Sequence, residues 1–210
     1  MSGGLTARLR APLRGRADLG EALSPGWIAL KAVELARRPV RADGQGPLTL
    51  GDLFDVSGEP GGRVRFEGDL ALADRVGAGL SEGEVIVEGS VGAEAGALMR
   101  RGLVAIAGGA GSHAGAGMIA GTVLVFGGIG AAVGLWSKRG SIVALGPVTV
   151  PSTYRYACTY QPVHLRMTLT RLRIRYALPV EQRHLTGFYR RYSGDLADLG
   201  KGEILAWTAE

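Results

Sequence analysis

The sequence is poor in cysteine, lysine and aromatic residues. Cys158 is the only cysteine in 210 residues, so an internal disulfide is excluded and nothing points to an oxidising compartment. The first residues carry arginines but no apolar run before a cleavage signal, and we therefore expect a cytoplasmic protein. Lysine occurs only at Lys31, Lys138 and Lys201, so arginine supplies most of the net charge of +5. Arginine suits bidentate contacts, which favours an acidic partner surface or an anionic ligand.

Charged residues are also missing from one internal stretch. Residues 102–137 contain no Asp, Glu, Lys or Arg, although the residues before them do. A solvent-facing surface of that size normally carries charge. We therefore expect this stretch to be covered, either by the chain's own terminal segments or by another subunit. No basic stripe with interleaved aromatic residues occurs in the glycine-rich repeat at 62–146, so we expect no nucleic-acid partner.

Glycine is abundant, with 35 residues, and much of it recurs with a fixed period. Within each of four series the step is 19 residues, and an earlier copy from Gly62 to Gly83 is looser at 21. Self-similarity in several phases at once is the signature of a repeat architecture. The four series are Gly83, Gly102, Gly121 and Gly140; Gly89, Gly108, Gly127 and Gly146; Gly92, Gly111 and Gly130; and Gly96, Gly115 and Gly134.

Short alternating strands lie between the first two glycines of each unit. Val85 and Val87 in one unit match Val104 and Ile106 in the next. A spacing of two places each pair on one face of a strand, and stacking at 19 residues turns the pairs into aliphatic columns. The pattern predicts a mainly β protein built on a right-handed parallel β-helix, a single-stranded solenoid of about five coils of about 19 residues. We expect an N-terminal strand and helix cap and a C-terminal α-helical cap over the open ends.

Two segments of the repeat imitate other structures. Residues 118–136 are almost wholly apolar and about as long as a membrane span, but their glycines keep the repeat phase, so we expect no membrane segment. Residues 109–115 resemble a dinucleotide-binding loop with the wrong spacing and without a following acidic residue. His113 lies in that loop, where we interpret it as a corner side chain bonded to nearby backbone. We assign no catalytic, cofactor-binding or metal-binding residue, because no Cys/His spacing suits zinc and no base or acid accompanies His113.

The flanks divide the chain into an N-terminal cap segment (1–61), the repeat (62–146) and a C-terminal cap and docking segment (147–210). Pro162 can begin a helix with one apolar face, and the opposite face carries arginines. Such a run is either a solvated surface or a docking surface for an acidic partner. The candidate docking residues are Arg166, Arg171, Arg173 and Arg175.

The glycine spacing of residues 89–96 resembles the β-helical GXGXG domain at the C-terminus of the large (alpha) glutamate synthase subunit. Within that superfamily, residues 192–195 and 200–203 resemble the family of C subunits of formylmethanofuran dehydrogenase, which includes the C subunit of the bacterial formyltransferase/hydrolase complex. The segments 48–56 and 154–165 fit the same family. The chain departs from the family in having fewer coils.

The resemblance implies a non-catalytic structural subunit of a complex in one-carbon metabolism. That complex moves a formyl group from tetrahydromethanopterin to a methanofuran-type carrier and hydrolyses it to formate. The implied partners are an amidohydrolase-like A subunit and the B and D subunits. Neither carrier is expected to bind to this chain, and Cys158 alone cannot hold a metal–pterin or an iron–sulfur cluster.

Three alternatives remain open at the level of sequence. One is the C subunit of a tungsten or molybdenum formylmethanofuran dehydrogenase. Another is a stand-alone glutamate-synthase-like GXGXG domain. A third is an independent enzyme with its active site in the β-helix groove, which would need clustered charged residues that residues 102–137 do not supply.

Overall fold

The computed structural model describes residues 3–23 and 25–209, and within them the protein is mainly β with few helices. A ten-stranded mixed sheet has the order β12-β13-β14-β11-β10-β9-β8-β6-β1-β5, and a four-stranded sheet has the order β4-β3-β2-β7. The helices are η1 (Trp27–Ala29), α1 (Ala32–Ala36), α2 (Leu50–Leu53), α3 (Val163–Tyr176) and α4 (Gln182–Thr186). The strands are β1 (Leu5–Leu9), β2 (Ala17–Asp18), β3 (Pro39–Ala42), β4 (Leu48–Thr49), β5 (Phe54–Gly58), β6 (Arg63–Glu67), β7 (Ala73–Asp74), β8 (Glu84–Val87), β9 (Leu103–Ile106), β10 (Thr122–Val125), β11 (Ser141–Ala144), β12 (Arg155–Tyr160), β13 (Phe188–Gly194) and β14 (Gly202–Thr208).

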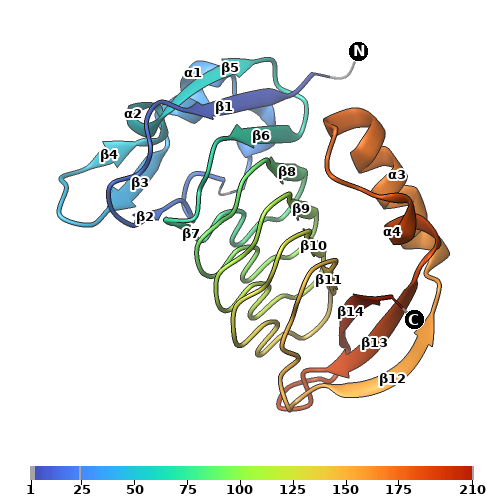
Figure 1. The fold of residues 1–210 in the computed structure, drawn as a ribbon. Coiled ribbons are helices and arrows are strands. Elements are labelled where there is room, and N and C mark those ends of the chain that lie inside the picture. Colours follow the sequence, from blue (N-terminus) through green and yellow to red (C-terminus); the bar gives the residue numbers. More distant parts are fainter. Residues whose placement is uncertain (1–2, 24, 210) are drawn as a thin grey trace.

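The repeat forms a stack of coils (Figure 1), and equivalent residues of successive coils are 19 apart in the chain, as Val85 and Val104 are. Strands β8, β9, β10 and β11 pair in parallel, and Val85, Val104, Val123 and Ile142 stand opposite one another. A second line of parallel bridges joins Leu70, Val91, Ala110, Ile129 and Val148. The 19-residue step inferred from the sequence is therefore the hydrogen-bonding register of the stack.

Alternate side chains of these strands enter two different cores. Val104 and Ile106 point into the coils, where they join the larger hydrophobic cluster. Leu103 and Ala105 face outward and belong to a second cluster that is covered by α3. The inside of the stack is thus a continuous aliphatic column, and one of its outer faces is covered by the C-terminal segment (Figure 1).

The ends of the stack are longer than the repeat alone indicates. At one end β1 pairs in parallel with β6, so that Leu5 lies opposite Val64. At the other end β14 pairs in parallel with β11, and Ile204 lies opposite Ile142. The expected C-terminal helix is present, but α3 covers the outer strand face of the stack, and the open end is extended by the strands β14, β13 and β12 instead of a helical cap (Figure 1). The terminal edges are thus covered by strands with no glycine repeat.

The glycine series serve two different structural needs. Gly115 has φ +67, a conformation that glycine adopts without a steric cost. Gly127 has no positive φ, but a Cβ there would lie 2.7 Å from the backbone nitrogen of Gly109 in the preceding coil. The Gly96 and Gly83 series behave like Gly115, whereas the Gly89 and Gly92 series behave like Gly127. Some of these glycines therefore make corners, and the others let neighbouring backbones approach closely.

Some corners adopt positive φ without glycine. Arg75, Glu94, His113 and Ala132 occupy equivalent places in successive coils and have φ between 59 and 61. The backbone N–H of His113 donates to the carbonyl of Ala131 in the next coil. The column is therefore a structural corner, as expected for His113. The expected bond from its side chain to nearby backbone is wrong: the imidazole makes no hydrogen bond to any other residue that the structure describes, and the backbone N–H makes the contact instead.

Replacing Ala132 by glycine should raise the free energy of unfolding by about 0.5–1 kcal/mol, because alanine at positive φ is strained and glycine is not. Chemical denaturation measures the change. The matched control is Ala131→Gly, next in the chain but without positive φ. Glycine at that control position should be destabilising by about 0.5–1 kcal/mol. Equal changes at the two positions would contradict this interpretation of the corner.

The apolar stretch 118–136 contains corners and β10, not a helix. Met118, Val123 and Val133 are buried inside the coils. No helix among the described residues has both the length and the apolar character to cross a membrane. The interior of the stack explains why this segment is apolar.

His184 holds α4 against the stack. Its ring packs edge-on between Phe126, just after β10, and Trp207 of β14, with centroid distances of 6.2 and 5.6 Å. Its Nδ1 accepts a hydrogen bond from the backbone N–H of Glu181 at 3.1 Å, so that nitrogen is unprotonated. Burial lowers the pKa of His184 below its ordinary value of 6.5.

The lowered pKa of His184 predicts a loss of stability in acid. Below about pH 6.5 the unfolded chain takes up a proton that the folded chain excludes, so the free energy of unfolding falls until the folded pKa is passed. Urea titrations at pH 7.5 and 5 should show this fall. In a His184→Gln variant the free energy of unfolding should differ less between pH 7.5 and pH 5. An unchanged difference would show that other groups cause the loss of stability in acid.

Candidate docking surface

Helix α3 has two apolar faces that lie on opposite sides. Leu165, Leu169, Leu172 and Tyr176 are buried against the outward residues of β8 to β11. This spacing of four, three and four residues is that of one helix face. The inner face therefore belongs to the fold, as the single apolar stripe in the sequence predicted.

A polar contact fixes α3 at its end. The Glu84 side chain on β8 is only 17% exposed, forms an ion pair with Arg171 and accepts a hydrogen bond from the Tyr176 hydroxyl at 2.8 Å. Burial, followed by this hydrogen bond, raises the pKa of Tyr176. The hydroxyl therefore stays a donor to Glu84, and the helix cannot rotate without breaking both contacts.

The outer face of α3 carries a second apolar ridge. Val163, Met167 and Ile174 are 74%, 73% and 78% exposed. They follow one another at four and seven residues, which places them on one line along the helix. A shallow depression of about 650 Å³ runs along this line. Large apolar side chains that form a continuous exposed ridge mark an interaction surface more often than a solvated one.

Arginine rows flank the ridge on both sides. At 100° per residue, Arg166 and Arg173 lie along one side, while Arg171 and Arg175 lie along the other. The helix contains no Asp or Glu. All four predicted docking residues thus flank the ridge and are exposed, and we name them together with Val163, Met167 and Ile174 the α3 surface.

The four arginines differ in what else they contact. Arg171 forms an ion pair with Glu84, and the Arg175 guanidinium lies 5.8 Å from the centroid of the Tyr176 ring. Arg166 and Arg173 are exposed. The docking role of the four arginines stays a prediction, and Arg166 and Arg173 are the members with which it can be tested without disturbing the contact to Glu84.

The apolar ridge was missed in the sequence, which was interpreted as one apolar face opposite one basic face. Val163, Met167 and Ile174 repeat the spacing of the inner face, shifted by two residues. A search for a second stripe would have found them. Because the two apolar stripes lie on opposite sides of α3, their contributions to the helical amphipathicity cancel, and the helix has weak amphipathic character.

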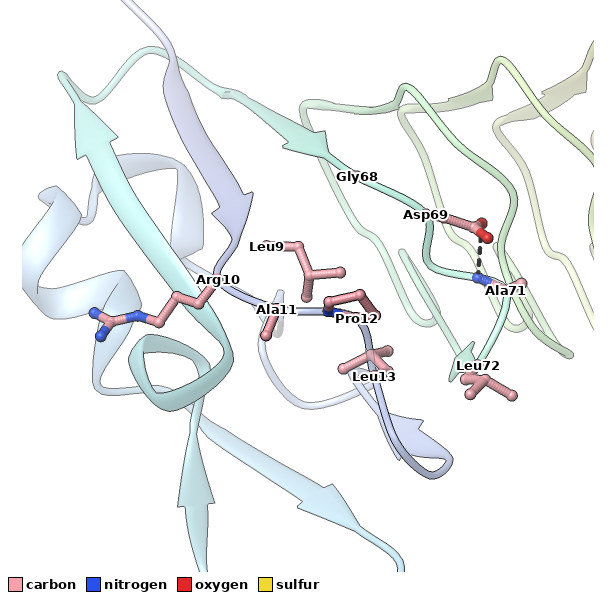
Figure 2. Close-up of a pocket in the computed structure, with 9 residues that line it drawn as sticks. All are labelled: Leu9, Arg10, Ala11, Pro12, Leu13, Gly68, Asp69, Ala71 and Leu72. Carbon is pink, nitrogen blue, oxygen red and sulfur yellow. Dashed lines mark hydrogen bonds between the residues drawn. The ribbon is translucent and has the colours of Figure 1, made fainter.

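A cavity in another part of the described chain lacks the groups for catalysis. Figure 2 shows this cavity of about 350 Å³ at the end of the stack, beside the turn that follows β6. Its polar members are Arg10, which pairs with Asp55, and Asp69, which accepts a hydrogen bond from the backbone N–H of Ala71 at 3.2 Å. The rest of the lining is apolar or glycine: Leu9, Ala11, Pro12, Leu13, Gly68, Ala71 and Leu72. No pair of acid and base, and no activated nucleophile, is present in it.

The described residues also include no group of three or more His, Cys, Asp or Glu side chains placed to bind a metal ion. His113 lies at a coil corner, His164 on α3 and His184 on α4, in three separate surroundings. Cys158 is exposed on β12.

The sequence resembles the C subunits of two characterised enzyme complexes. No protein-family model matches it. Over 87 residues, 41% of this chain, the sequence is 39% identical to the C subunit of the formyltransferase/hydrolase complex Fhc of Methylorubrum extorquens. Over 80 residues, 36% of this chain, it is 33% identical to the C subunit of the tungsten-containing formylmethanofuran dehydrogenase 2 of Methanothermobacter thermautotrophicus. The resemblance to these C subunits is thereby confirmed. The matches cover 32% and 30% of the two relatives, so the chain matches about a third of their length.

Among solved structures, a chain of the formyltransferase/hydrolase complex FhcABCD of Methylorubrum extorquens, crystallised with methylofuran, aligns with a TM-score of 0.47. The sequence identity in that alignment is 28%, and it covers 96% of this chain and 98% of the other.

Proposed function

We propose that this chain is a non-catalytic structural subunit of a formyltransferase/hydrolase complex. The observation that carries the proposal is the 39% identity to the C subunit of the Fhc complex over 87 residues. The 33% identity to the C subunit of a dehydrogenase over 80 residues is lower, so the dehydrogenase is the second candidate. The exposed α3 surface supports a subunit role, because it provides an apolar ridge with cationic flanks for a neighbouring chain.

The proposal includes partners and carriers that this chain does not itself hold. The partners are an amidohydrolase-like A subunit and the B and D subunits, assembled in the cytoplasm. Tetrahydromethanopterin delivers the formyl group in the complex, and a methanofuran-type carrier receives it. This chain's contribution is to position the other subunits, and α3 is the element with which it contacts one of them.

We also propose that the stack of coils is a right-handed parallel β-helix. It is supported by the parallel pairing of β8 to β11 and by the second line of bridges from Leu70 to Val148. An experimental structure would test the hand of the coils. Left-handed coils would contradict the proposal.

The function is tested by isolating the assembly through an affinity tag on this chain in its source cells. The expected result is recovery of an amidohydrolase-like subunit and a formyltransferase in fixed ratio, with release of formate from the formylated pterin. Omitting the chain from a reconstituted mixture should lower that activity by preventing assembly, without changing the active site. Recovery of a metal–pterin subunit would favour the dehydrogenase, and recovery of the chain alone would contradict both.

A further inference from the structure

One column of coil corners carries bulky side chains in a backbone conformation that suits glycine. Gly79, Leu98, Gly117 and Trp136 are equivalent positions in four successive coils, with φ of 67, 58, 63 and 57. Leucine and tryptophan are uncommon at positive φ because the Cβ crowds the backbone. Since the same corner is glycine in two of the four coils, the fold itself does not need a large side chain there.

These two side chains also gain little from the rest of the chain. Leu98 is 58% exposed and Trp136 is 60% exposed. Leu98 lies across Gly117 of the next coil, where an added Cβ would be 2.7 Å from the leucine Cδ2. An exposed apolar side chain at positive φ is doubly unfavourable in the isolated chain. A large apolar side chain at these positions is therefore favourable only if it contacts another molecule.

The neighbouring column adds an apolar residue and a rim of cations. Ile119, 41% exposed, lies two residues after the corner column. Arg100, Arg101, Lys138 and Arg139 surround it on the coils before and after, and all four are exposed. Their side chains form no hydrogen bond or ion pair with any residue that the structure describes. We name Leu98, Ile119, Trp136 and these four cations the corner surface.

We propose that the corner surface binds a second partner protein, whose contact region has an apolar centre and a rim of Asp and Glu. The charge pattern argues for this occupant, since four cations without internal partners surround an uncharged centre. Trp and Arg are also the residues that most often dominate protein interfaces. The corner surface lies on residues of the coil corners, separate from α3, and the proposal holds whichever complex contains the chain.

Two other occupants fit the chemistry less well. A second copy of the chain bound face to face would bring the cations of one copy against those of the other. A membrane surface requires an apolar element that enters the headgroup region by about 5–10 Å. These corners are held in place from both sides, for example by the hydrogen bonds from Leu98 N to Ala116 O at 2.7 Å and from Gly117 N to Leu135 O at 2.8 Å. They cannot leave the stack to insert.

The first test is site-specific photocross-linking of the full chain in its source cells. Benzoylphenylalanine replaces Trp136 in one experiment and Ala131, exposed elsewhere on the same coil, in the control. Position 136 should cross-link to a different protein, at a peptide with apolar residues flanked by Asp or Glu, and position 131 should not give that product. A cross-link to this same chain, a lipid adduct or no product at position 136 overturns the proposal.

The second test uses the partner peptide region so identified and separates docking from stability. Leu98→Gly with Trp136→Gly restores the residue found in the sibling coils, so the Tm should stay the same or rise while the Kd for the partner weakens at least tenfold. Arg100→Glu with Arg101→Glu should weaken the Kd at least tenfold and reduce its salt dependence, whereas Arg155→Glu should leave it unchanged. A fall in Tm with an unaltered Kd means a structural role and overturns the proposal.

The outcome is independent of the proposed function. A cross-linked partner that is not a formyltransferase/hydrolase subunit would count against the proposed complex but would support the corner surface. Conversely, a fully assembled complex in which position 136 gives no cross-link would support the complex and overturn the corner surface.

Discussion

Replacing Gly127 by alanine should lower the free energy of unfolding by about 3 kcal/mol. The added methyl group would lie 2.7 Å from the Gly109 nitrogen and 2.8 Å from the Gly108 carbonyl carbon. Both atoms belong to backbone that is hydrogen-bonded within the stack, and Gly127 N itself donates to Gly108 O at 2.8 Å. Neither coil can move away without losing its ladder, so the contact is relieved only by opening the stack locally.

The adjacent glycine supplies the control. A Cβ at Gly128 would have its nearest neighbour at 3.7 Å, and Gly128 has no positive φ. Gly128→Ala should therefore change the free energy of unfolding by less than about 0.5 kcal/mol. Urea denaturation of both variants measures the difference. If the two alanines cost the same, the coils are not packed backbone to backbone as described.

Replacing Met167 and Ile174 together by glutamate should weaken binding of the partner subunit at least a hundredfold. Both side chains are more than 70% exposed, so the isolated chain should keep its Tm. In the complex, two carboxylates would be buried against an apolar surface, and a hundredfold loss corresponds to about 2.7 kcal/mol. Analytical gel filtration and titration calorimetry with the purified partner measure the two effects.

Val33→Glu is the matched control for this double variant, since Val33 is an exposed apolar residue on another helix, α1. It should leave binding unchanged. Arg166→Glu with Arg173→Glu should also weaken binding, and more so at low salt, if the partner is acidic. Arg171 is unsuitable for this test, because a glutamate there would face Glu84 and damage the isolated fold. If binding is unchanged in all these variants, the partner does not bind to α3.

The stack was predictable because its determinants are periodic in the chain. Val85, Val104 and Val123 stand opposite one another as the 19-residue step requires. The helix at 163–176 was also predictable from Pro162 and its inner apolar stripe. By contrast, β14 lies outside the 19-residue period: it begins at Gly202 as β11 follows Gly140, but only its pairing with β11 shows that Ile204 continues the column of Ile142. Strands whose pairing depends on tertiary contacts leave little local signal.

The docking surfaces were predictable only in part. The arginines of α3 were found from charge alone, whereas the exposure of Met167 and Ile174 depends on which face the stack covers. The uncharged stretch 102–137 is covered by α3 on its strand face, whereas its corners at Ile119 and Trp136 are exposed, so the expectation of covered coils holds for one face only. Positive φ at Leu98 and Trp136 has no sequence signal, because those residue types disfavour it.

The segment before the stack shows why a continuous helical pattern can mislead. Residues 25–39 carry a helical pattern bounded by Pro25 and Pro39, but the structure has η1 and α1, separated by extended backbone at Leu30 and Lys31. The break lets Trp27 and Leu35 both reach the core, with 1% and 0% exposure. Burial of these two side chains outweighs the local propensity for one longer helix.

Oxidation of Met167 tests the central claim most directly, namely that this chain serves as a subunit held through α3. Met167 is 73% exposed, whereas Met99 and Met118 are fully buried and serve as internal references in the same digest. With dilute peroxide, we expect rapid sulfoxide formation at Met167 in the isolated chain and at least tenfold slower formation in the purified complex. Equal rates at Met167 in the two samples would contradict that claim.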